Sequence, residues 1–215
     1  MLEQIQDQLQ GLYDLQLPHR VSDFLVTDAA LARHLSGISG HADEALLVHQ
    51  PDDQTLDLSL FVDAAVLRRL AERSPDQPWD AMALQDWWLA LEGVSHFLCV
   101  VWRAERDLST TALELELQAE IDKFLLTAWA LGEHHGAPSL APLHDTLFRR
   151  ARLRGDLSPQ LQDRYRRANR MAASYCQQLQ RRHRVWPVDG GLLRELRRFY
   201  RFDRQGKERH IRRLT

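Results

Sequence analysis

The chain has 215 residues, with 28 Lys and Arg against 30 Asp and Glu, and a formal net charge of −2 at pH 7. Its length fits one large domain or two small ones, and its 44% hydrophobic content can build a core without disulfide or metal support. The first residues lack the basic-then-apolar pattern of a signal peptide, and no apolar run approaches the roughly 20 residues that span a bilayer. We therefore expect a cytoplasmic protein with no membrane partner, in which Cys99 and Cys176 are reduced core residues.

The near-neutral total hides a strong asymmetry of charge along the chain. Residues 1–147 contain 8 basic and 24 acidic residues, a net of −16, whereas residues 148–215 contain 20 and 6, a net of +14. A basic third of a chain is typical of proteins that meet a polyanion or an acidic partner. It can also pack against the acidic part of its own chain, and the opposite poles could join copies head to tail in a homo-oligomer.

The first part of the chain mixes helical and strand patterns. Its clearest feature is a hairpin within 44–62, with a turn at 51–54. Along the second strand, apolar residues alternate with polar ones, with Phe61 as the exception. The predicted elements, in chain order, are a helix over 2–16, a strand over 21–26, a helix over 29–35, strands over 44–49 and 56–62, and a helix over 64–73.

The rest of the chain is helical by pattern. Thr111 and Glu114 form a capping box, and Ser158 with Pro159 is a strong helix start. The predicted helices run over 80–106, 111–136, 140–153 and 158–183, followed by a helical tail from Leu192 with a break at Gly206.

These elements predict an α+β fold that is predominantly α-helical. A small N-terminal lobe, with the β-hairpin and an additional strand, would pack on a helical bundle. We place the lobe at residues 1–75 and the bundle, with its basic C-terminal helices, at residues 76–215. A single compact domain that contains both parts is the other arrangement consistent with the length.

The first helix of the predicted bundle is apolar around nearly its whole circumference. Its narrow polar stripe contains Glu92 and His96 one turn apart, and both side chains would need buried partners. The second helix carries Glu116 and Glu120 on one face at the same spacing. Because carboxylates and an imidazole on adjacent helices can bind a metal ion or move protons, these four residues form a candidate metal or acid–base site.

A structural role for the same residues stays open. Glu116, Glu120 and Lys123 also form the i, i+3 and i+4 pattern of a solvated helix face, and Glu92 could simply pair with His96 in the core. The repeated Glu-x-x-His signature of dinuclear helical bundles is absent, as is His-Glu-x-x-His. We therefore expect no catalytic residue, no metal and no cofactor, with the four-residue site as the alternative.

The basic C-terminal region is rich in arginine, which is the better donor for paired contacts with phosphate or carboxylate. Phe199, Tyr200 and Phe202 alternate with arginines, a pattern that suits single-stranded nucleic acid. The same aromatic residues could instead dock an amphipathic helix on the body of the protein. The candidate binding residues are Arg149, Arg150, Arg152, Arg154, Arg166, Arg167, Arg170, Arg197, Arg198 and Arg201.

Two functional hypotheses result from these patterns. We expect a non-enzymatic accessory or interaction protein whose basic C-terminal helical face binds a polyanion, with nucleic acid as the leading candidate, or an acidic protein partner. The alternative is an enzyme whose site contains Glu92, His96, Glu116 and Glu120. The first hypothesis requires arginines that are not consumed by the acids of residues 1–147, and the second requires access to the four-residue site.

Overall fold

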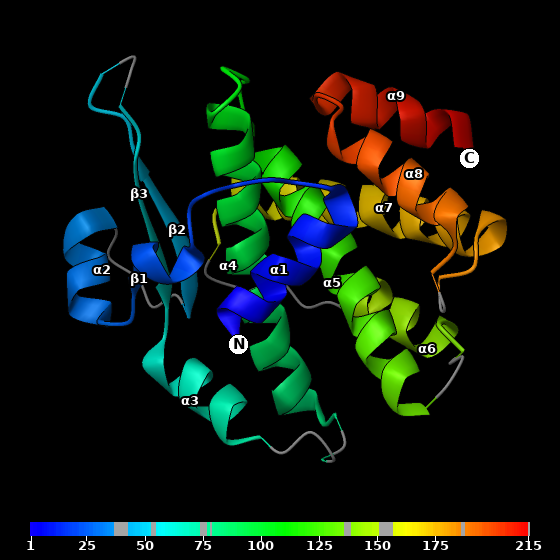
Figure 1. The fold of residues 1–215 in the computed structure, drawn as a ribbon, viewed down its shortest axis with the longest axis horizontal. Coiled ribbons are helices and arrows are strands. Elements are labelled where there is room, and N and C mark those ends of the chain that lie inside the picture. Colours follow the sequence, from blue (N-terminus) through cyan, green and yellow to red (C-terminus); the bar gives the residue numbers. More distant parts are fainter. Residues whose placement is uncertain are drawn as a thin grey trace.

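The computed structural model describes residues 1–36, 43–52, 55–73, 77, 79–135, 139–150, 157–185 and 188–214. It confirms the predominantly helical α+β fold, with a small sheet beside a helical bundle (Figure 1). The helices are α1 (Leu2–Tyr13), α2 (Ala29–Ser36), α3 (Ala64–Glu72), α4 (Ala81–Ala104), α5 (Ala112–His135), α6 (Ala141–His144), α7 (Pro159–Arg182), α8 (Gly190–Tyr200) and α9 (Arg204–Leu214). The strands are β1 (Leu25–Val26), β2 (Glu44–His49) and β3 (Asp57–Val62).

The predicted hairpin is confirmed, and β3 is the central strand of the sheet. β2 runs antiparallel to β3, with Glu44 opposite Val62 and His49 opposite Asp57. β1 pairs with the other edge of β3 in parallel. Residues 53–54 of the predicted turn lie outside the described residues.

The strand predicted over 21–26 is wrong for most of its length. Val21–Phe24 is a 3₁₀ turn, and only Leu25–Val26 pairs with the sheet. The cause lies in α1, where the buried amide of Gln6 accepts a hydrogen bond from Val21 N (2.8 Å) and donates one to His19 O (2.7 Å). These side-chain contacts satisfy backbone groups that a strand would have paired with a neighbour.

Helix starts follow the sequence closely. Thr111 N donates to Glu114 Oε2 (2.9 Å) and Glu114 N donates to Thr111 Oγ1 (3.3 Å), which completes the predicted capping box. Ser158 caps α7 as predicted, and the carboxylates of Asp28, Asp63 and Asp80 accept backbone N–H groups at the starts of α2, α3 and α4.

Boundaries in the C-terminal part differ from the prediction. The helix expected over 140–153 is the short α6, continued by a π-helical turn over Asp145–Arg149, and residues 151–156 lie outside the described ones. The break expected at Gly206 lies earlier in the chain. Asp203 Oδ1 accepts a hydrogen bond from Gly206 N (2.7 Å), which places this glycine inside the first turn of α9.

The core gathers around α4 and α5. α4 packs against α1, α3 and the sheet, while α5 lies between α4 and α7 (Figure 1). Because α5 has a helix on either side, polar residues on two of its faces are enclosed by protein. No helix in the described part of the chain is long and apolar enough to cross a membrane.

Candidate functional site

Ionisable side chains converge where β2, α4, α5 and α7 meet, and we call this group the α4–α5 cluster. The structure brings all four residues of the sequence-predicted metal or acid–base site into it. The cluster consists of Glu44 from β2, Glu92 and His96 from α4, Glu116, Glu120 and Lys123 from α5, and Arg164 from α7. Glu44 and Arg164 are not part of the site predicted from the sequence.

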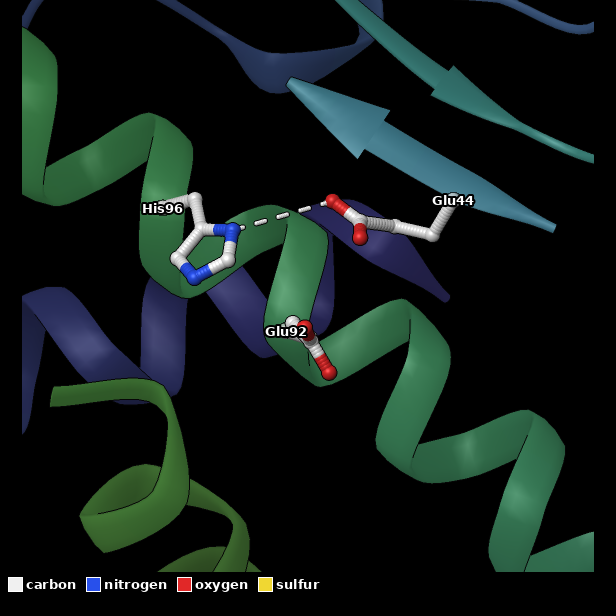
Figure 2. A group of neighbouring side chains, drawn as sticks. All are labelled: Glu44, Glu92 and His96. Carbon is white, nitrogen blue, oxygen red and sulfur yellow. Dashed lines mark ion pairs between the residues drawn. The ribbon is translucent and has the colours of Figure 1, made fainter. Parts of the chain in front are cut away.

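His96 lies between two carboxylates. Its Nδ1 is 3.8 Å from Glu44 Oε1, and its Nε2 is 3.8 Å from Glu116 Oε2. Figure 2 shows the Glu44 carboxylate directed at the imidazole, with Glu92 one turn away on α4. Both distances exceed the 2.7–3.2 Å of an N–H···O hydrogen bond. Accordingly, neither Glu44 Oε1 nor His96 Nε2 makes a hydrogen bond, although both atoms are fully buried.

The other carboxylates of the cluster have direct cationic partners. Lys123 Nζ lies 2.5 Å from Glu92 Oε2 and 2.9 Å from Glu120 Oε1. An Arg164 nitrogen lies 3.4 Å from Glu116 Oε1. Lys123 and Glu116 side chains are below 10% exposed, so the solvated-face interpretation of this α5 pattern is wrong.

The cluster carries an excess of negative charge. Four carboxylates face one lysine and one arginine, a net of −2 when His96 is neutral. Burial alone would lower the pKa of His96, but the Glu44, Glu116 and Glu92 carboxylates outweigh burial and raise it to about 9. Burial raises the pKa of Glu116 to about 7 and raises that of Glu44 as well.

A glycine allows the sheet to approach α4 at this point. A Cβ on Gly93 would lie 2.8 Å from Leu60 Cδ1 and 3.2 Å from Glu44 Oε1. Any larger residue would therefore press on the side chains of Leu60 in β3 and Glu44 in β2. The glycine next to Glu92 is thus the sequence signal that something packs closely against this turn of α4.

The cluster is closed on the sheet side and more open on the side of α7. The side chains of Glu44 and His96 are below 10% exposed, those of Glu92 and Glu120 are 18% and 19% exposed, and that of Arg164 is 31% exposed. Ions, water and small molecules can reach such a site more readily than a large substrate can.

A second polar network lies on another face of α5 and was not predicted. Asp122 accepts hydrogen bonds from Tyr13, from Ser95 (2.6 Å) and from Gln118 (3.0 Å). Lys207 of α9 donates to Gln118 Oε1 (2.9 Å). Burial raises the pKa of Asp122 to about 6. This network connects α1, α4, α5 and α9, and its satisfied hydrogen bonds indicate a structural role.

The predicted arginine-binding residues divide into exposed and engaged side chains. Arg197 donates to the carbonyl of Leu12 (3.1 Å), and Arg201 donates to that of Tyr13 (3.1 Å), so both cap the C-terminal end of α1. Arg152 and Arg154 lie outside the described residues. Arg149, Arg150, Arg166, Arg170, Arg198 and Arg201 are exposed, whereas Arg167 and Arg197 are partly buried.

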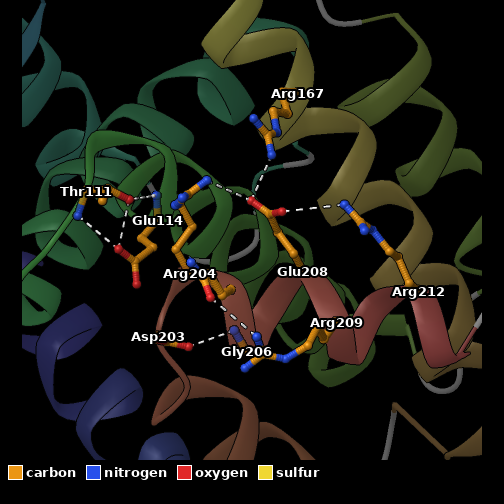
Figure 3. A network of polar contacts seen from close by, with 10 residues as sticks. Thr111, Glu114, Arg167, Asp203, Arg204, Gly206, Glu208, Arg209 and Arg212 are labelled. Atoms are coloured by element: carbon orange, nitrogen blue, oxygen red, sulfur yellow. Dashed lines mark hydrogen bonds and ion pairs between the residues drawn. The ribbon is translucent and has the colours of Figure 1, made fainter.

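Several of the remaining basic side chains meet at one carboxylate. Figure 3 shows Glu208 of α9 contacted by Arg167 (2.8 Å), Arg204 (3.2 Å) and Arg212 (3.6 Å). The aromatic residues Phe199 and Tyr200 are 1% and 3% exposed. They belong to the core, so the stacking surface that their spacing suggested is absent from the described part of α8.

Comparison of the chain with protein-family models, with curated proteins and with solved structures gives no significant match, so the function is argued from the sites themselves.

Proposed function

We propose that the protein binds one divalent transition-metal ion in the α4–α5 cluster, with Glu44, Glu92 and His96 as ligands. The observation that carries the proposal is that one donor atom from each of these residues lies within 4.8 Å of the other two. Two of these side chains, Glu44 and His96, are more than nine-tenths buried and face each other without a hydrogen bond. Buried polar atoms normally have a partner, and an ion between Glu44 and His96 Nδ1 would supply one for Glu44 Oε1.

The donor set suggests the class of metal. Two carboxylates and one imidazole are a mixed oxygen and nitrogen set, which suits Zn²⁺, Mn²⁺ or Fe²⁺ better than the all-oxygen sites of Ca²⁺ and Mg²⁺. Bonds of about 2.0–2.2 Å would draw the three side chains slightly closer together. Glu92 can bridge Lys123 and the ion, because the lysine contacts only its Oε2 atom.

The second ring nitrogen of His96 faces a carboxylate, and this arrangement supports His96 as a metal ligand. Nδ1 faces Glu44, which leaves Nε2–H directed at Glu116, and Arg164 in turn holds Glu116. Metal-bound histidines commonly donate their second N–H to a carboxylate in this way, which fixes the tautomer and the ring orientation.

Charge balance points in the same direction. The raised pKa of His96 means that an ion must displace the imidazole proton to bind; with His96 neutral, the α4–α5 cluster has a net charge of −2, which one divalent ion neutralises. Uncompensated buried charge is costly, so the ion would stabilise the region around β2 and α4 as well as occupy it. The limited access favours ion binding, with water or a small molecule as further ligands, over chemistry on a large substrate.

The test is equilibrium dialysis of chelator-treated protein against Zn²⁺ or Mn²⁺, followed by metal analysis. Wild type should bind one equivalent, and His96→Gln and Glu44→Gln should each lose more than tenfold in affinity, since even outer-shell changes cost about 10–100-fold. Glu116→Gln should show a smaller loss. His210→Gln is the matched control, because His210 is mostly buried and pairs with Glu195 at 2.5 Å outside the cluster.

Two outcomes would overturn this function. Wild-type protein that binds none of the tested ions would leave the cluster as a purely structural network. Binding that is equal in wild type, His96→Gln and Glu44→Gln would place the ion elsewhere on the chain. Circular dichroism of each variant separates loss of the ion from loss of the fold.

A further inference from the structure

The outer surface of α7 presents a row of polar and basic side chains. At 100° per residue, Arg166, Arg170, Gln177 and Arg181 fall within a sector of about 60° on this helix. All four are exposed. The row from residue 166 to residue 181 spans about 22 Å at 1.5 Å per residue.

Two of these arginines have no polar partner in the part of the chain that the structure describes. Within the described residues, Arg170 and Arg181 make no hydrogen bond or ion pair, and Arg166 contacts only the neutral amide of Gln162 (3.1 Å). Arg167, by contrast, lies outside this sector, about 70° around the helix from its centre, and is held by Glu208 (2.8 Å). Exposed Asp163 lies in the same sector one turn before Arg166, so the face has a net positive charge, and this charge is concentrated toward Arg170 and Arg181.

A pocket of about 290 Å³ lies at the C-terminal end of this row, between α7 and the π-helical turn. Arg149 from the turn and Arg181 from α7 both line it, together with the amides of Gln177 and Gln180. Asp145 also lines the pocket, and its carboxylate pairs closely with Arg150 (2.6 Å) and loosely with Arg149 (3.9 Å). Two guanidinium groups and two amides from separate elements form a set of hydrogen-bond donors suited to one phosphate group.

We propose that the α7 row and this pocket bind the phosphate backbone of double-stranded nucleic acid. This surface is separate from the metal site, and the proposal does not depend on that function. No apolar side chain larger than that of the half-buried Ala173 interrupts the row, whereas the centre of a protein–protein interface is apolar and aromatic. The aromatic residues Phe199 and Tyr200 are buried, so base stacking is not offered by α8.

The test is fluorescence anisotropy with DNA and RNA duplexes of mixed sequence, about 20 base pairs long, at salt concentrations between about 50 and 200 mM. Wild type should bind, with affinity that falls steeply as salt rises. Arg170→Gln/Arg181→Gln should weaken binding at least tenfold at the lowest salt. The variant should also lower the slope of log affinity against log salt by about 1.8, since each contacted phosphate contributes about 0.9. A preference for one duplex identifies the source of the phosphate.

The control is Arg209→Gln/Arg213→Gln on α9, which removes the same charge from two exposed positions. It should leave binding within about twofold of wild type. An equal loss in both double variants would show that net charge, not the α7 row, attracts the ligand. Absence of binding to both duplexes, or capture of polyglutamate in preference to them, would overturn the proposal. Melting temperatures of all variants exclude unfolding as the cause.

Discussion

The described carboxylates of α4 and α5 are buried or partly buried, whereas most of the described arginines of α7, α8 and α9 are exposed. In the α4–α5 cluster, four buried or partly buried carboxylates surround a lysine and a histidine, and Figure 2 shows two of them beside His96. In the C-terminal helices, one carboxylate, Glu208, contacts three arginines near the surface (Figure 3). The first region carries negative charge inside the protein, whereas the second carries positive charge near the surface.

This difference teaches that net charge along a chain does not predict which charges face solvent. Part of the excess negative charge is buried inside the protein, and cations or bound protons must balance it there. The basic excess is divided between helix caps, such as Arg197 and Arg201, and the free row on α7. Matched variants in the two regions test whether buried and exposed charges differ in their effect on stability.

The largest effect should come from removing the cation at the centre of the buried region. Lys123→Met leaves Glu92 and Glu120 without their partner and should destabilise the protein by about 3–5 kcal/mol in urea unfolding with chelator present. The matched variant is Arg150→Gln, which breaks an ion pair of similar length (2.6 Å) at a side chain that is 76% exposed. It should change stability by less than about 1 kcal/mol. Similar losses of stability in Lys123→Met and Arg150→Gln would contradict the expected difference between buried and exposed ion pairs.

Gly93→Ala should have the next largest effect. The added methyl group would press on Leu60 and Glu44 and should cost about 1–3 kcal/mol, together with a loss of metal affinity as Glu44 moves. Gly11→Ala is its control, because a Cβ there meets no heavy atom within 4 Å. That variant should be neutral or stabilising by up to about 1 kcal/mol. Metal affinity unchanged in Gly93→Ala would argue against Glu44 as a ligand.

Asp122 gives a pH-dependent test of the buried region. Its pKa is raised from 3.8 to about 6 in the folded protein, so the native state binds the proton more tightly than the unfolded chain. The stabilising contribution is therefore complete below pH 4 and is lost as pH rises through 6. Asp122→Asn cannot lose a proton, and its stability relative to wild type should rise by on the order of 2 kcal/mol from pH 4 to pH 7. Urea unfolding at both pH values measures the free energy of unfolding of the two proteins. A difference between them that is the same at pH 4 and pH 7 would refute the raised pKa of Asp122.

The smallest effect should come from the helix caps in the basic region. Arg201→Gln removes hydrogen bonds to the carbonyls of Tyr13 and Asp14 and should cost about 0.3–1 kcal/mol. Arg198→Gln removes an equally exposed charge that stacks on Phe202 but caps no helix, and should stay within about 0.5 kcal/mol of wild type. Thermal unfolding at low salt resolves the two variants, and an equal loss in both would show that Arg201 is not a cap.

Helical spacing predicted a large part of the candidate site. Because α4 is apolar nearly all round, it had to be buried, and Glu92 with His96 had to find partners on the next helix. Glu44 and Arg164 could not be predicted in the same way, since they come from a strand and a distant helix that only the tertiary fold brings together. Gly93 was the available signal of that close approach, but one glycine in a helix does not identify what packs against it.

The same limit explains the other errors. Val21–Phe24 has the composition of a strand. However, Val21 N donates its hydrogen bond to the side-chain amide oxygen of Gln6, which lies 15 residues earlier in the sequence. Asp122 and Gln118 lie between apolar residues of α5, where helix periodicity alone does not distinguish a buried network from a solvated face. Local capping signals such as Thr111 with Glu114 were reliable, because all their partners lie within one turn.

The most direct test of the metal-binding cluster is anomalous X-ray diffraction from crystals grown with Zn²⁺ and measured above and below the zinc absorption edge. The account predicts an anomalous peak about 2.0–2.2 Å from His96 Nδ1 and from a carboxylate oxygen of Glu44 and of Glu92, absent in crystals of His96→Gln. A map with no peak between these three side chains, or with zinc only at exposed histidines such as His49, would contradict it.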